Sequence, residues 1–341
     1  MSKKPKKIVC LGGGNAMPNT ILSELKNYDV EISSISSMSD SGGSAGEERR
    51  RFGTPVTYGD IRRAAYSLSG APADVRDFLN KRLENKEDIE KACEIYPIIK
   101  PFVLKNPERF KGHVLSNIIA SCTDKRFGPI RAIENLNEIF KISPNKTFGV
   151  TISGSPVLVE LEGGKKIKGE VNIDIPKHDP NLKIVDVLLD PPAEAYHPAV
   201  EAIKKADLIT IGPGDLFSSI AQILLVGGIS EAINQSQAKK VYICNLMTKN
   251  GETNGFSVLD FAGWIGKLLN GNLNFVTIHN KEKPSPKRLE EYKKEHPELI
   301  NMVDFNENLD KSKFIGANVL VSSGPIVHDS KKLAKILLRL L

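Results

Sequence analysis

The feature that most constrains this chain is a short apolar segment that runs directly into three consecutive glycines, residues 7–16 (KIVCLGGGNA). Beyond the glycines, Ile21, Leu22 and Leu25 recur at helical spacing, so the pattern predicts a strand, a tight turn and a helix. Glycine lacks a Cβ atom, so such a turn lets another molecule approach the backbone. The first N–H groups of the helix have no partner within it and attract an anion, most often a phosphate. The alternative is a turn whose glycines only let the strand and the helix pack closely.

The composition excludes several classes of protein. The 341 residues are 40% hydrophobic and 26% charged, as in ordinary globular proteins. No run of about eighteen apolar residues is present, so we expect no membrane-spanning helix. Aromatic residues make up 6% of the chain and are not interleaved with basic ones, so we expect no nucleic-acid surface, while the net charge of +6 suits a small anionic ligand. Four scattered cysteines and the absence of a signal-peptide pattern predict a cytoplasmic protein with reduced thiols.

The order of the apolar patterns predicts the fold class. Strands alternate with helices, which favours an α/β protein with a mostly parallel sheet and helices on both faces. We expect a single α/β domain over residues 1–341. Charged helical patterns broken by prolines predict a helical insertion over residues 71–140, and a period of two around a Gly-Gly turn predicts a β-hairpin and edge insertion over residues 147–190.

A second glycine-rich loop follows the next predicted strand, which ends near Met38. Its backbone N–H groups, hydroxyls and single carboxylate come from Asp40, Ser41, Gly42, Gly43 and Ser44. Ligands of open parallel sheets bind at the carboxyl ends of the strands, so this loop and the first glycine turn can converge on one crevice. Asp60 precedes a further helical pattern, where its carboxylate either caps the helix or contacts a ligand.

A third strand, turn and helix span residues 206–220, and the turn consists of Gly212, Pro213 and Gly214. Proline stiffens this turn, and the two glycines bring the backbone close to whatever occupies it. Asp215 and Ser218 open the helix and either cap it or contact a ligand. This turn therefore belongs to the same predicted crevice as the first one.

Three further polar or flexible side chains are candidates for the crevice. Asn245 ends another apolar strand, and Met247 opens the polar loop that follows it. Asn117 lies on an otherwise apolar helical face. A buried amide needs hydrogen-bond partners, so Asn117 either ties down a loop or faces a pocket.

In this order, the motifs resemble those of the 2-phospho-L-lactate transferase superfamily, and within it the gluconeogenesis-factor branch. The motifs are Gly12-Gly13-Gly14, Ser39-Asp40-Ser41-Gly42-Gly43-Ser44, Gly59-Asp60-Ile61-Arg62, Gly112-His113 with Asn117, Ile211-Gly212-Pro213-Gly214 with Ser218, and Cys244-Asn245-Leu246-Met247-Thr248 with Gly251-Glu252-Thr253. The resemblance implies a Rossmann-like fold with inserted elements and a nucleotide or nucleotide-sugar site at the strand ends. The expected ligand-binding residues are Gly12, Gly13, Gly14, Asn15, Asp40, Ser41, Gly42, Gly43, Ser44, Asp60, Asn117, Gly212, Pro213, Gly214, Asp215, Ser218, Asn245 and Met247.

The same resemblance implies a function. Gluconeogenesis factors bind UDP-sugars such as UDP-N-acetylglucosamine and are linked to cell shape and cell-wall synthesis, so we expect a non-catalytic regulatory protein. A homodimer and a cell-wall enzyme are the expected protein partners. This chain departs from the branch pattern at Asn15, Ser41 and Arg63. The departure at Ser41 removes an acid beside the expected phosphates, a change that either weakens metal binding or shifts the choice of ligand. Asp40 is the candidate ligand of a Mg²⁺ ion that accompanies a nucleotide diphosphate.

Two enzymatic functions stand as alternatives. A transferase would move a phospholactyl group onto a deazaflavin, but the second loop lacks the Asn-Thr-Gly-Asp-Asp pattern of true transferases. A nicotinamide oxidoreductase would need a glycine three residues beyond Gly14, where Met17 stands. The sequence favours the binding protein over both enzymes.

Overall fold

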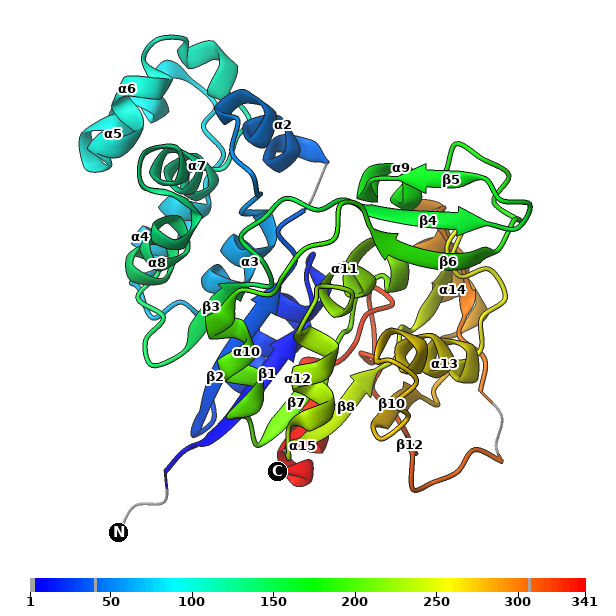
Figure 1. The fold of residues 1–341 in the computed structure, drawn as a ribbon. Coiled ribbons are helices and arrows are strands. Elements are labelled where there is room, and N and C mark those ends of the chain that lie inside the picture. Colours follow the sequence, from blue (N-terminus) through cyan, green and yellow to red (C-terminus); the bar gives the residue numbers. More distant parts are fainter. Residues whose placement is uncertain (1–3, 40–41, 306–307) are drawn as a thin grey trace.

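The computed structural model describes residues 4–39, 42–305 and 308–341. At its centre lies a sheet of seven parallel strands in the order β12–β10–β8–β7–β1–β2–β3 (Figure 1). In chain order they are β1 (Lys6–Leu11), β2 (Val30–Ser36), β3 (Lys146–Gly149), β7 (Leu208–Ile211), β8 (Lys239–Ile243), β10 (Val276–Asn280) and β12 (Phe314–Ala317). From β1, the next strands in the chain, β2 and β3, are added in sequence toward one edge of the sheet. The later strands β7, β8, β10 and β12 are added on the other side of β1, toward the opposite edge. The strand order therefore reverses between β1 and β7, where open α/β sheets bind ligands.

Both faces of the sheet are buried, because apolar side chains alternate between them. In β1, Ile8 and Cys10 belong to one core, and Val9 and Leu11 belong to the other. The first core also includes side chains from the π-helical turn η1 (Pro18–Leu22), α1 (Ser23–Leu25), α3 (Gly59–Leu68) and α15 (Ser330–Leu340). The second includes side chains from α10 (His197–Lys204), α11 (Ala221–Leu224), α12 (Ile229–Gln235) and α13 (Val258–Leu268). This arrangement confirms the predicted α/β class with helices on both faces.

The range predicted as a helical insertion, residues 71–140, forms helices grouped to one side of the sheet (Figure 1). They are α4 (Ala73–Asn80), α5 (Lys86–Ile95), η2 (Pro97–Ile99), α6 (Lys100–Val103), η3 (Pro107–Phe110), α7 (Leu115–Phe127) and α8 (Pro129–Ile139). Helix α2 (Gly43–Phe52), which precedes this range, packs against α7. The second glycine-rich loop therefore leads into the helical group.

The predicted hairpin forms a small antiparallel sheet in the order β5–β4–β6 (Figure 1). Its strands are β4 (Val157–Leu161), β5 (Lys166–Lys168) and β6 (Ile184–Leu189), with α9 (Glu170–Asp174) between the last two. The prediction was wrong at its start, because residues 147–149 belong to β3, the edge strand of the central sheet. Asn137 of α8 holds β3 there, since its carboxamide accepts from and donates to the backbone of Thr147.

Two short strands and a helix complete the region around the sheet's carboxyl edge. β9 (Met247–Lys249) pairs with β11 (Leu299–Met302), and α14 (Pro286–Glu295) precedes β11. The edge strand β12 ends at Ala317, well before α15 begins at Ser330. All four cysteines are buried and free of disulfides. Across the described ranges, no helix combines the length and apolarity that crossing a bilayer requires.

Candidate functional site

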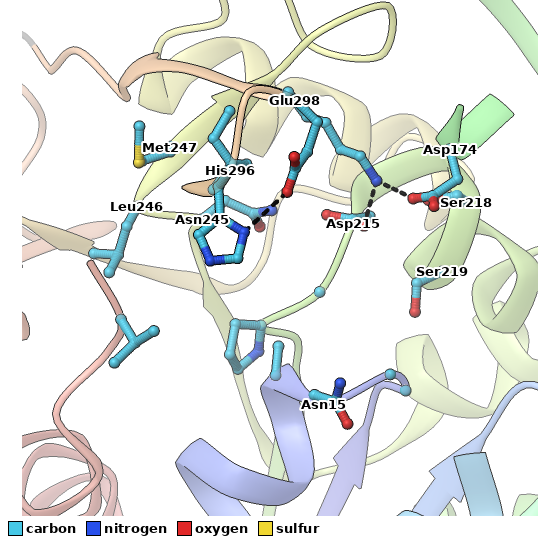
Figure 2. Close-up of a pocket in the computed structure, with 18 of the residues that line it drawn as sticks. Asn15, Asp174, Asp215, Ser218, Ser219, Asn245, Leu246, Met247, His296 and Glu298 are labelled. Atoms are coloured by element: carbon cyan, nitrogen blue, oxygen red, sulfur yellow. Dashed lines mark hydrogen bonds and ion pairs between the residues drawn. The ribbon is translucent and has the colours of Figure 1, made fainter. Parts of the chain in front are cut away.

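A cavity of about 990 Å³ opens at the carboxyl ends of β1, β7 and β8 (Figure 2). The turns at residues 12–14 and 212–214 both border it, although about two hundred residues separate them in the chain. They meet because β1 pairs directly with β7, with Leu11 opposite Ile211 at the strand ends. The strand order thus places both glycine turns on one cavity, at the reversal point of the sheet.

The first glycine turn combines packing with open backbone donors. The N–H of Gly12 donates to the carbonyl of Ile35 at 3.1 Å and extends the sheet. A Cβ atom at Gly12 would lie 2.8 Å from the Cβ of Met17, so this glycine allows close packing of the turn against the helix. Gly14 has a φ of +60°, a backbone conformation that glycine adopts readily. Among the described residues, the N–H groups of Gly13 and Asn15 have no hydrogen-bond partner.

Asp60 binds the first turn instead of capping a helix. Helix α3 begins one residue earlier, at Gly59, and its N-cap, Tyr58, makes no side-chain capping bond. The Asp60 carboxylate accepts from the N–H of Gly14 at 3.0 Å and from the Arg63 guanidinium at 2.6 Å. The predicted capping role was therefore wrong, and one of the amides expected to face a ligand is already paired. Arg63, a departure from the branch pattern, brings a positive charge to this turn.

The glycine turn at residues 212–214 leads into another π-helical turn, η4 (Leu216–Ile220). The N–H of Gly212 donates to the carbonyl of Leu11 at 2.8 Å, so this group belongs to the sheet. In the described part of the chain, the N–H groups of Gly214 and Asp215 have no partner. Ser218 donates its hydroxyl to Glu252 at 3.0 Å and its N–H to the same carboxylate at 3.3 Å. Gly214 and Asp215 thus offer the second pair of open donors to the cavity.

A buried lysine, Lys249, binds three carboxylates. Two of these carboxylates, those of Asp174 and Asp215, lie on one side of the cavity (Figure 2). The Lys249 ammonium donates to Asp174, lies 2.8 Å from Asp215 and lies 3.2 Å from Glu252. Lys249 and Glu252 are 7% and 4% exposed. Burial raises the pKa of Glu252, against the opposing effect of Lys249. For Lys249 burial alone would lower the pKa, but the surrounding carboxylates raise it above its usual value, so this lysine stays charged.

The oxygens of Asp174, Asp215 and Glu252 lie within 4.8 Å of one another, a spacing that could hold a metal ion. However, the Lys249 ammonium contacts all three carboxylates. A Mg²⁺ ion requires near-octahedral oxygen ligands free of a competing cation. These residues therefore do not fit a Mg²⁺ site while Lys249 is among them.

The remaining wall comes from the C-terminal part of the chain. The rings of Tyr292 and His296 are 4.5 Å apart, and the His296 Nδ1 lies 3.2 Å from Glu298 (Figure 2). His328 Nε2–H donates to the carbonyl of Cys244 at 3.1 Å. Burial lowers the pKa of His328 to about 4, so its imidazole is neutral near pH 7. This wall therefore combines aromatic rings, a neutral histidine at position 328 and the carboxylate of Glu298.

The structure brings ten of the predicted residues to the cavity and leaves others elsewhere. Those that line it are Gly13, Gly14, Asn15, Asp60, Pro213, Gly214, Asp215, Ser218, Asn245 and Met247. Gly12 and Gly212 donate hydrogen bonds to the adjacent strands and are not among the residues that line the cavity. Asn117 does not line it either, since it lies 2% exposed within α7 of the helical group. A ligand-binding role for these three residues stays a prediction.

The second glycine-rich loop is only partly described. Gly42 is the N-cap of α2, and Gly43 and Ser44 are the first two residues of that helix. None of the three is among the residues that line the cavity. Asp40 and Ser41 lie outside the described residues, so the expected Mg²⁺ ligand stays a prediction. The sequence missed the following lining residues: Arg63, Asp174, Lys249, Tyr292, His296, Glu298 and His328.

Comparison with known proteins identifies the family. The family model described as 2-phospho-L-lactate transferase CofD matches residues 8–320. The chain belongs to this family. Within the CofD family, a relative from Thermotoga maritima is 34% identical over 98% of this chain and 99% of its own length. Relatives from Listeria innocua and Bacillus subtilis, both named gluconeogenesis factor, are 31% and 29% identical over the whole chain and cover 98% and 99% of their own lengths.

These relatives place the chain in the gluconeogenesis-factor branch of the CofD family, as its motifs predict. The crystal structure of a Bacillus halodurans protein superimposes with a TM-score of 0.83 at 28% identity. The match covers 98% of this chain and 100% of that protein. The seven-stranded fold is therefore also that of a solved structure.

Proposed function

We propose that this gluconeogenesis factor binds a nucleotide sugar, such as UDP-N-acetylglucosamine, and acts as a regulator of cell shape and cell-wall synthesis, not as an enzyme. The observation that carries the proposal is the pair of glycine turns at the sheet's reversal point. Together they contribute four lining residues, Gly13, Asn15, Gly214 and Asp215, whose N–H groups are unpaired among the described residues. Converging backbone donors at helix N-termini favour the oxygens of a diphosphate.

The size and charge of the cavity support this ligand class. Its volume of about 990 Å³ is at the upper end of the range of about 300–1,000 Å³ typical of small-molecule sites, which leaves room for a sugar beside a nucleotide. Arg63 adds a cation at the first turn, next to Asp60. The same proposal includes four further features. They are a Mg²⁺ ion held by Asp40, assembly as a homodimer, a cell-wall enzyme as a partner, and a cytoplasmic location.

A thermal-shift screen tests the proposal directly. A ligand that binds only the native state raises its stability by RT ln(1 + [L]/Kd). We expect UDP-N-acetylglucosamine to raise the melting temperature more than GDP or NAD does. No rise with any nucleotide diphosphate at about 5 mM, well above common ligand affinities, would contradict the proposal.

The alternative function is a transferase that moves a phospholactyl group onto a deazaflavin, because the matching family model is described as a 2-phospho-L-lactate transferase. Mass spectrometry of a mixture of the protein, a deazaflavin and activated phospholactate separates the two functions. We expect no product from this chain. A product that forms in proportion to protein concentration would establish the transferase and remove the non-catalytic proposal.

A further inference from the structure

We propose that the cavity is divided into two ends, so that the nucleobase binds at Leu246 and Met247 and the sugar binds at Asp174 and Asp215. This inference rests on the proposed function and assigns an orientation to its ligand. In Figure 2 the two pairs of side chains lie on opposite sides of the cavity, and Asn15 of the first glycine turn lies between them. The diphosphate occupies this middle position, against the open N–H groups of both turns.

The first end is apolar and carries one polar group suited to a base edge. Leu246 and Met247 line it (Figure 2). Ile326 belongs to the same hydrophobic core as these two residues, and both Ile326 and its neighbour in the chain, the 40% exposed Val327, line the cavity. A flat aromatic ring that packs on apolar surface inside a cavity removes that surface from water, which stabilises the complex. The Asn245 carboxamide oxygen is buried without a hydrogen-bond partner in the described ranges. The imide N–H of a uracil supplies the missing donor, and the adjacent base carbonyl can accept from the Asn245 amide.

The opposite end is acidic and excludes the other parts of the ligand. Asp174 and Asp215 keep side chains that are 40% exposed although both contact Lys249. One lysine among three carboxylates leaves the group negative, so it repels a diphosphate. Carboxylate oxygens instead accept hydrogen bonds from hydroxyl groups. A neutral, hydroxyl-rich sugar is therefore the part of the ligand that fits this end.

Isothermal titration calorimetry with two ligands, UDP and UDP-N-acetylglucosamine, distinguishes the contributions of the two ends of the cavity, because only the second ligand carries the sugar. Val327→Asp places a charge on the base wall, so both affinities should fall by about tenfold, since a polar group must now be desolvated. Asp174→Asn replaces one of the two acceptor oxygens with an NH2 donor and removes the negative charge. The sugar nucleotide should then bind about fivefold more weakly, while UDP, whose diphosphate meets less repulsion, should bind no more weakly than it does to the wild type.

Matched variants outside the cavity control for charge and fold. Val185→Asp introduces the same charge at an exposed apolar residue of β6, which is 43% exposed. Asp186→Asn changes another aspartate that is paired with a lysine, Lys267, on the surface. Both control variants should keep wild-type affinities for both ligands. Melting temperatures of all four variants identify any that fail to fold.

The result overturns the proposed orientation if Asp174→Asn weakens both ligands equally, or if Val327→Asp weakens only the sugar nucleotide. The orientation also fails if the wild-type protein binds UDP and UDP-N-acetylglucosamine with equal affinity, although nucleotide binding itself would then stand. If the wild-type protein binds neither ligand, the proposed function and this inference both fall.

Discussion

At the scale of single residues, the ion pair between Lys249 and Glu252 is the most deeply buried contact between charged groups described for the site. Replacing it with methionine, Lys249→Met, keeps the length of the side chain but leaves Glu252, which is 4% exposed, without its cation. Breaking a buried ion pair from one side typically costs about 3–5 kcal/mol, and we expect the free energy of unfolding in urea to fall by that amount. The matched variant Lys267→Met breaks a pair with the exposed Asp186 and should cost less than about 1 kcal/mol. Equal losses would show that the cluster does not stabilise the fold.

His328 gives a prediction about pH. Its pKa is lowered from 6.5 to about 4 in the folded protein, so below pH 6.5 the unfolded chain binds more protons than the native one, and stability falls as the pH falls. Each pH unit between these values costs about 1.4 kcal/mol. His328→Gln keeps an N–H donor for Cys244 but cannot titrate. Urea unfolding between pH 7 and pH 4.5 should show a steeper loss for the wild type than for this variant, and parallel curves would contradict the assignment.

Some residues of the site can be predicted from the sequence, and others cannot. Gly13, Asn15 and Gly214 could be predicted, because a strand, its glycine turn and the following helix are all local in sequence. Asp174 and His296 could not, since each comes from an otherwise exposed segment and reaches the cavity only through tertiary packing. Lys249 was within reach, because it stands between Asn245 and Glu252 in the loop after a predicted strand.

At the scale of elements, one side chain joins α8 to the edge of the central sheet. Asn137 accepts from the N–H and the hydroxyl of Thr147 at 2.9 and 2.8 Å and donates to its carbonyl at 3.1 Å. Asn137→Ala leaves these groups of β3 unpaired, so we expect a loss of about 2–3 kcal/mol and faster hydrogen exchange at the Thr147 amide. Glu134→Ala, on the exposed side of the same helix, is the control and should change neither. An unaltered Thr147 exchange rate would mean that β3 holds its place without α8.

Elements also show where sequence patterns lose information. Strand β1 was predicted close to its observed bounds, because burial of both faces leaves the continuous apolar run of residues 8–11. β9 and β11 have three and four residues, too few for a period to be recognised. Their pairing nevertheless brings Lys249 opposite Leu299 on the rim of the cavity. Such short strands depend on tertiary pairing, which no local pattern records.

At the scale of the whole molecule, the site is assembled from segments far apart in the chain. Residues 13–16, 213–219 and 245–250 follow the carboxyl ends of β1, β7 and β8. Residues 174–176 lie at the end of α9, which connects β5 to β6 in the small antiparallel sheet. The ion pair between Asp174 and Lys249 links that sheet to the cavity. A ligand that spans the cavity would therefore touch both parts of the fold at once, so its binding should stabilise these distant segments together.

Hydrogen–deuterium exchange measured by mass spectrometry tests this joint stabilisation. With UDP-N-acetylglucosamine at a concentration about tenfold above its Kd, most of the protein is bound. We expect slower exchange in peptides that cover residues 13–16, 174–176, 213–219 and 245–250, because a bound ligand must dissociate before these segments open. Helix α5 (Lys86–Ile95) contributes no residue to the cavity and should exchange at its ligand-free rate. Slowing confined to residues 71–140, with no change at the glycine turns, would place the ligand in the helical group and rule out the cavity between the glycine turns as its binding site.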